Sequence, residues 1–84
     1  MSQLLDYFAE WDPMGFIKEL GAPHDEYSLE AATIRQKYAS SMSGKEVGIL
    51  TYATFVELIE LDPADFKEEA AKRGDQIKAI LDTE

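Results

Sequence analysis

The sequence predicts an all-α protein, a compact single-domain bundle of four to five short helices that spans residues 1–84. Apolar residues recur at helical spacing through most of the chain, and residues that start or stop helices separate these segments. A chain of 84 residues, of which 45% are hydrophobic, is long enough for one small core and too short for a second domain. It contains no Cys, so disulfides do not support that core.

The first helix is expected to begin at Ser2, whose hydroxyl can cap its N-terminus, and to end near Trp11. Its end follows from Pro13, because the proline ring disfavours helical backbone at the preceding Asp12. Proline is itself favoured in the first turn of a helix. A second short helix is therefore expected from Pro13 to Leu20, with Asp12 as its cap.

An ordered loop is expected next, because residues 21–27 combine Gly, Pro and acidic side chains. Ser28 should cap the third helix, and the run of small residues that begins at Ser40 should end it. Ser43 and Glu46 have the spacing of a capping box, in which each side chain bonds the backbone N–H of the other residue. A fourth helix should therefore follow.

This fourth helix is expected to be the most buried, because its apolar residues between 47 and 61 extend well beyond one face. Its first half, residues 47–52, also has a composition typical of strands. A second Asp-Pro pair at residues 62–63 predicts the start of a fifth helix. Gly74 inside that helix indicates a bend or a close contact with another helix, and residues 82–84 should fray.

Acidic residues outnumber basic ones by 17 to 8, and the formal net charge is −9. Nucleic-acid binding needs clustered Lys and Arg for phosphate contacts, whereas Lys72 and Arg73 are the only adjacent pair. An anionic membrane surface is disfavoured for the same reason, and no segment reaches the ~18 apolar residues of a membrane span. We therefore expect a soluble cytoplasmic protein that binds neither nucleic acid nor membrane.

The sequence contains no recognisable catalytic motif, so we expect a protein that is not an enzyme and holds no cofactor or metal. Its one His lies in the segment His24-Asp25-Glu26, whose side chains could ligate a metal or take part in acid–base chemistry. Three polar residues after a Pro more often form a solvated loop. An enzyme or metal protein built on this loop is therefore the less favoured alternative.

Two segments resemble the signature of a known group of proteins. The segment Trp11-Asp12-Pro13-Met14-Gly15, followed by an acidic loop over residues 21–27 that ends in Tyr, is similar to a family of small bacterial all-helical proteins. The resemblance covers residues 4–34, and the family is mainly a domain of unknown function, with similar modules beside toxin–immunity loci. It implies one structural corner formed by Trp11, Asp12, Pro13, Gly15, Asp25, Glu26 and Tyr27.

The expected function is protein–protein interaction, with a partner that carries a basic surface, since acidic side chains steer such partners. The predicted binding residues lie in the acidic N-terminal third and include exposed aromatics: Glu10, Asp12, Asp25, Glu26 and Tyr27. Trp11 is either part of the core or an anchor for the partner. The alternatives are an immunity-type inhibitor of a basic nuclease toxin, and a homo-oligomer formed through an uncovered apolar face of residues 47–61.

Overall fold

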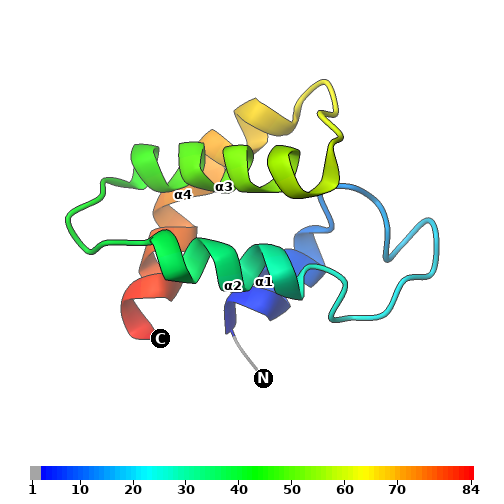
Figure 1. The fold of residues 1–84 in the computed structure, drawn as a ribbon, viewed down its shortest axis with the longest axis horizontal. Coiled ribbons are helices and arrows are strands. Elements are labelled where there is room, and N and C mark those ends of the chain that lie inside the picture. The colour runs from blue at the N-terminus through cyan, green and yellow to red at the C-terminus, as the bar shows by residue number, and fades with distance from the viewer. Residues whose placement is uncertain (1–2) are drawn as a thin grey trace.

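Four helices make up the fold, which a computed structural model describes over residues 3–84 (Figure 1). They are α1 (Gln3–Trp11), α2 (Ser28–Lys37), α3 (Gly44–Ile59) and α4 (Phe66–Thr83). No strand occurs among these residues, so the predicted all-α class is confirmed. Ser2, the expected cap of the first helix, lies outside the described residues.

The helices form a closed ring of contacts, in which α3 packs on α2 and α4, and α1 packs on the same two helices. One buried cluster joins them, formed by Leu4, Phe8, Tyr27, Ala31, Ile34, Val47, Phe55, Phe66, Ala70, Ile77 and Leu81. Over residues 3–84, no helix combines the length and the apolar character that a membrane crossing requires.

Phe55 of α3 lies at the centre of this core. The ring of Phe8 meets it edge-on with centroids 5.0 Å apart, and the rings of Tyr27 and Phe66 lie 5.5 Å away. Aromatic rings bury large apolar areas and favour such edge-on and tilted contacts. The core of this small chain therefore depends mainly on aromatic packing.

α3 and α4 approach each other closely because glycines lie where they cross. A Cβ atom on Gly74 would lie 2.0 Å from the carbonyl oxygen of Gly44, and one on Gly48 would lie 2.8 Å from that of Ala70. Neither distance leaves room for a side chain, so the two backbones touch directly. The close helix contact predicted at Gly74 is confirmed.

Residues 13–20 form a series of turns, so the prediction of a second helix from Pro13 to Leu20 is wrong. The reason is the backbone of Gly15, whose φ of 72° lies in the left-handed region and interrupts a right-handed helix. Single turns close on either side of Gly15, with the Gly15 N–H donating to the Asp12 carbonyl and the Glu19 N–H donating to the Gly15 carbonyl.

The capping box that starts α3 is confirmed. The N–H of Glu46 donates to the Ser43 hydroxyl at 3.1 Å, and the N–H of Ser43 donates to the Glu46 carboxylate at 3.0 Å. Residues 47–52 are helical despite their strand-like composition. Ser28, in contrast, is the first residue of α2 rather than its cap, and Tyr27 in the cap position makes no side-chain capping bond.

α3 was expected to be the most buried helix, and it buries Val47, Gly48, Thr51, Thr54 and Phe55 but leaves some of its other apolar residues exposed. Thr51 and Phe55 are fully buried, whereas Ile49 is 54% exposed and Leu58 is 39% exposed. The other helices pack against one side of α3 and leave its outer side uncovered (Figure 1).

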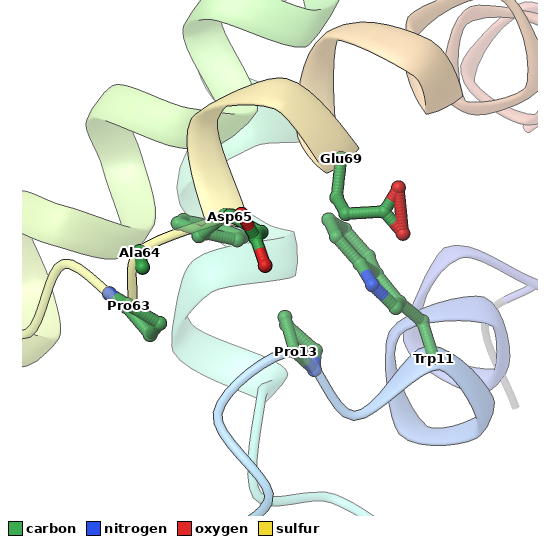
Figure 2. Close-up of a pocket in the computed structure, with 7 residues that line it drawn as sticks. Trp11, Pro13, Pro63, Ala64, Asp65 and Glu69 are labelled. Atoms are coloured by element: carbon green, nitrogen blue, oxygen red, sulfur yellow. The ribbon is translucent and has the colours of Figure 1, made fainter.

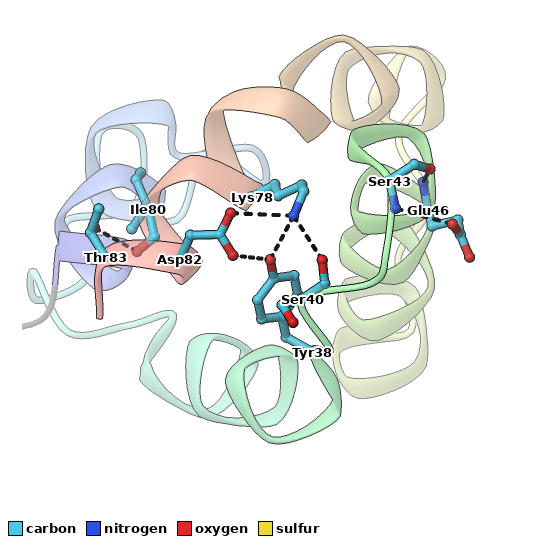
Figure 3. A network of polar contacts seen from close by, with 8 residues as sticks. All are labelled: Tyr38, Ser40, Ser43, Glu46, Lys78, Ile80, Asp82 and Thr83. Atoms are coloured by element: carbon cyan, nitrogen blue, oxygen red, sulfur yellow. Dashed lines mark hydrogen bonds and ion pairs between the residues drawn. The ribbon is translucent and has the colours of Figure 1, made fainter.

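The last turns of α4 are tied to the end of α2, as Figure 3 shows. Lys78 donates through Nζ to the Tyr38 hydroxyl at 2.9 Å, the Ser40 carbonyl at 3.2 Å and Asp82 at 3.2 Å. The Tyr38 hydroxyl also donates to Asp82, and this bond, together with Lys78, lowers the pKa of the Asp82 carboxyl. One network thus joins α4, the end of α2 and the loop between α2 and α3.

Glu84 is also held. Its carboxylate accepts from the Arg35 guanidinium at 3.0 Å and from the Leu4 backbone N–H at 3.3 Å. α4 continues through Thr83, and the prediction that residues 82–84 fray is wrong. These contacts are between residues far apart in the sequence, which explains why local composition missed them.

The glycine contact between α3 and α4 can be tested with Gly74→Ala. Alanine is favoured over glycine by about 1 kcal/mol inside a helix, but here its Cβ would overlap the Gly44 carbonyl. We expect the free energy of unfolding, measured by urea denaturation, to fall by about 1–3 kcal/mol. The control Ala79→Gly, at an exposed site of the same helix, should cost only about 1 kcal/mol. A Gly74→Ala variant as stable as the parent would contradict the contact.

Candidate functional site

The segment after α1 is organised by the side chain of Asp12, which is 7% exposed. Its φ of 51° turns the chain sharply at the end of the helix. One carboxylate oxygen accepts from the Tyr27 hydroxyl at 2.5 Å and from the Ile17 N–H at 3.2 Å, and the other accepts from the Lys18 N–H at 2.9 Å. The Asp12 side chain therefore binds two backbone N–H groups of the following turns, and the prediction that it caps a helix is wrong because no helix follows.

Burial and hydrogen bonding act in opposite directions on this carboxyl. Burial alone would raise the pKa of Asp12, but the bonds from Tyr27, Lys18 and Ile17 outweigh it, so the pKa lies below its ordinary value. Burial and the bond to Asp12 raise the pKa of Tyr27 well above its ordinary value. Asp12 is therefore ionised and Tyr27 neutral at physiological pH.

Tyr27 is fully buried, so the prediction that it is an exposed aromatic is wrong. Its ring stacks on Phe16 with centroids 6.1 Å apart and also contacts Phe55 of the core. Its hydroxyl bonds Asp12 and accepts from the Met14 N–H at 3.3 Å. Asp12 and Tyr27 therefore form an internal contact that no partner can reach.

The other predicted binding residues are on the surface. Glu10, Asp25 and Glu26 are all exposed, and their role in binding stays a prediction. His24 lies 2.9 Å from the carboxylate of Asp6. In the described part of the chain, no three His, Asp or Glu side chains gather as metal ligands would.

A pocket of about 230 Å³, termed here the Trp11 pocket, lies between the end of α1 and the start of α4. It is lined by Trp11, Pro13, Pro63, Ala64, Asp65, Phe66 and Glu69. Figure 2 shows Pro13 and Pro63 on one side, the Asp65 carboxylate pointing between Pro13 and Trp11, and Glu69 beside the indole ring. The two Asp-Pro segments of the sequence thus meet at one place.

Trp11 is held in this pocket by tilted contacts with aromatic rings and by a cation that lies over its own ring. Its ring centroid lies 5.7 Å from that of Phe66 and 6.4 Å from that of Phe55. The Arg73 guanidinium lies over the indole at 4.5 Å and donates to the Tyr7 hydroxyl at 3.0 Å. Because Trp11 is only partly buried, it joins the core to the surface.

The carboxylates at the rim have few partners. Asp65 makes no capping bond to α4, and the Asp65 side chain forms no ion pair within residues 3–84. Glu69 makes one long contact, 4.0 Å, with the exposed Lys72. A pocket with apolar walls and two accessible carboxylates suits a Lys or Arg side chain, whose stem is apolar and whose end is cationic.

Asp65 and Glu69 were not predicted as site residues, because acidic residues at the start of a helix are already explained by the helix dipole. The repeated Asp-Pro pair was the signal in the sequence that pointed to this place. Taken alone, the pair predicts only where helices begin and end, since sequence spacing does not show that residues 13 and 63 meet.

Comparison of the chain with protein-family models finds no match, and comparisons with curated proteins and with solved structures find no significant match. The resemblance to the small bacterial family therefore stays a prediction. Of the corner that it implied, Asp12 contacts both Tyr27 and the N–H of Gly15, while Asp25 and Glu26 are exposed.

The contact between Asp12 and Tyr27 predicts a pH-dependent stability. Since the pKa of Asp12 is lowered by folding, its stabilisation is present above about pH 4 and is lost as pH falls through the folded-state pKa. Tyr27→Phe removes one donor and should lower the free energy of unfolding by about 1–3 kcal/mol at pH 7. Urea denaturation from pH 7 to 3 should show a smaller loss for this variant than for the parent. Tyr7→Phe, whose hydroxyl bonds Gln76 and Arg73 rather than a carboxylate, is the control, and equal acid dependence in Tyr27→Phe and parent would contradict the assignment.

Proposed function

We propose that this chain is a non-enzymatic protein-interaction module that binds a basic segment of another protein. A Lys or Arg side chain of that segment fills the Trp11 pocket, with its stem against the indole and Pro63 and its cation near Asp65 and Glu69. The observation that supports this best is an apolar pocket with two accessible carboxylates in a chain of net charge −9.

The size of the pocket favours a side chain over a free small molecule. Small-molecule sites commonly enclose about 300–1,000 Å³, and this pocket encloses about 230 Å³. A cation–π contact and an exposed charge pair each contribute on the order of 1 kcal/mol. The pocket alone would therefore bind weakly, and the surrounding surface must add to the affinity.

The exposed carboxylates of Glu10, Asp25 and Glu26 supply such a surface, because acidic side chains attract a basic partner and speed its association. At physiological salt this attraction extends about 8 Å, so it guides the partner only near contact. An immunity-type inhibitor of a basic nuclease toxin is a narrower form of this proposal, since it would use the same acidic surface.

The proposal can be tested with a short Arg-rich peptide and the fluorescence of Trp11, the only Trp in the chain. We expect saturable binding that weakens at high salt, because exposed charge contacts are screened. The double variant Asp65→Asn/Glu69→Gln should bind about tenfold more weakly, since it removes both charges near the bound cation.

The matched control Glu57→Gln/Glu68→Gln removes two exposed acidic charges outside the pocket and should bind nearly as well as the parent. Equal losses in the two double variants would mean that only net charge matters, and the pocket assignment would be wrong. Charge reversal at Asp25 and Glu26 then measures the contribution of the N-terminal surface. Unchanged fluorescence and no binding at low salt would contradict the proposed function.

A further inference from the structure

A second pocket lies on the outer side of the crossing between α3 and α4. It encloses about 200 Å³ and is lined by Lys45, Gly48, Ile49, Tyr52, Lys67 and Ala71. No carboxylate lines it, although the chain has 17 acidic residues. We call it the α3–α4 pocket, and it shares no lining residue with the Trp11 pocket.

Small residues create this pocket. The position of Gly48 has no room for a side chain, because a Cβ atom there would lie 2.8 Å from the Ala70 carbonyl oxygen and 3.0 Å from Cα of Ala71. Ala71 fills little of the space beside it. The contact that brings the two helices together therefore leaves a hollow on their outer surface, and the 54% exposed Ile49 forms part of its wall.

The two lysines that line this pocket are available to a ligand. Within residues 3–84, neither Lys45 nor Lys67 forms an ion pair, whereas Arg35, Lys72 and Lys78 do. Lys67 lies over the Tyr52 ring at 5.7 Å, which places its ammonium beside the pocket. This pocket is therefore lined by apolar groups and two ammonium groups, while the Asp62 carboxylate, which does not line it, accepts from the Tyr52 hydroxyl at 2.6 Å.

We infer that the α3–α4 pocket binds a large apolar side chain of an acidic peptide segment, with carboxylates on either side of that side chain contacting Lys45 and Lys67. A volume of about 200 Å³ suits one Phe or Leu side chain and is small for a free ligand. Asp62 is bonded to the Tyr52 hydroxyl and does not line the pocket, and acidic residues more than about 8 Å away are largely screened at physiological salt, so neither prevents this contact.

The probe is a short synthetic peptide with one Phe between Glu residues, titrated into the ¹⁵N-labelled chain and followed by amide chemical shifts. We expect saturable shifts at Gly48 and Ala71, and little response to peptides in which Ala replaces the Phe or Lys replaces the Glu residues. Filling the pocket with Ala71→Leu should abolish these shifts. Ala79→Leu, at another exposed site of α4, should leave them intact.

The charges are tested separately. Lys45→Gln/Lys67→Gln should weaken binding about tenfold, as expected for the loss of two exposed charge contacts. The control Lys37→Gln/Lys72→Gln, which also removes two exposed lysines, should bind like the parent. Circular dichroism must show that every variant keeps its helix content and melting temperature.

Three outcomes would overturn the inference. The first is no shift at Gly48 and Ala71 at millimolar peptide, and the second is an equal response to the Lys-containing peptide. The third is concentration-dependent self-association of the free chain that Ala71→Leu removes, which would assign the pocket to a second copy. Because the probe is acidic and the readout lies outside the Trp11 pocket, these outcomes leave the proposed binding of a basic segment untouched.

Discussion

The carboxylate of Asp12 is the contact on which the N-terminal half of this structure depends. The backbone of Asp12 is left-handed and ends α1. Its carboxylate accepts hydrogen bonds from the backbone N–H groups of Ile17 and Lys18 and from the hydroxyl of Tyr27. Tyr27 in turn packs on Phe55 at the centre of the core. A single ionised group thus connects the end of a helix, an irregular loop and the core, and it fixes the place where Pro13 meets the Trp11 pocket.

A comparison with Glu30 shows why the partners of Asp12 matter. Glu30 on α2 is also buried, but its Oε1 has no hydrogen-bond partner within residues 3–84. Burial, and to a smaller extent the charge of Glu26, raises the pKa of Glu30, whereas the pKa of Asp12 is lowered. The pKa values of two buried carboxyl groups in one small domain therefore shift in opposite directions, because the two groups face different numbers of hydrogen-bond donors.

Features that depend on neighbouring residues could be predicted from the sequence. The end of α1 before Pro13 and the capping box of Ser43 and Glu46 are of this kind. The glycine at position 74 indicated a close contact or a bend, but its partners Gly44 and Gly48 follow only from the packing of the helices. The helix expected over residues 13–20 failed because the residue types at its start favour a helix, while the left-handed backbone of Gly15 interrupts it.

The candidate site could be predicted only in part. Trp11 was identified as either core or anchor, and the structure makes it both a neighbour of Phe55 and a wall of the pocket. The burial of Tyr27 and the meeting of Pro13 with Pro63 depend on residues far apart in the chain. No local pattern contains that information, since it arises only when the helices pack.

The first two turns of α4 separate the two pockets. Asp65 and Glu69 lie four residues apart and line one pocket, while Lys67 and Ala71 lie four residues apart and line the other. Residues four apart share one face of a helix, and residues two apart lie on nearly opposite faces. This segment therefore has a charge separation perpendicular to its axis. A charged segment therefore meets charges of opposite sign at the two pockets, and this local difference favours one orientation of the segment as it comes near contact.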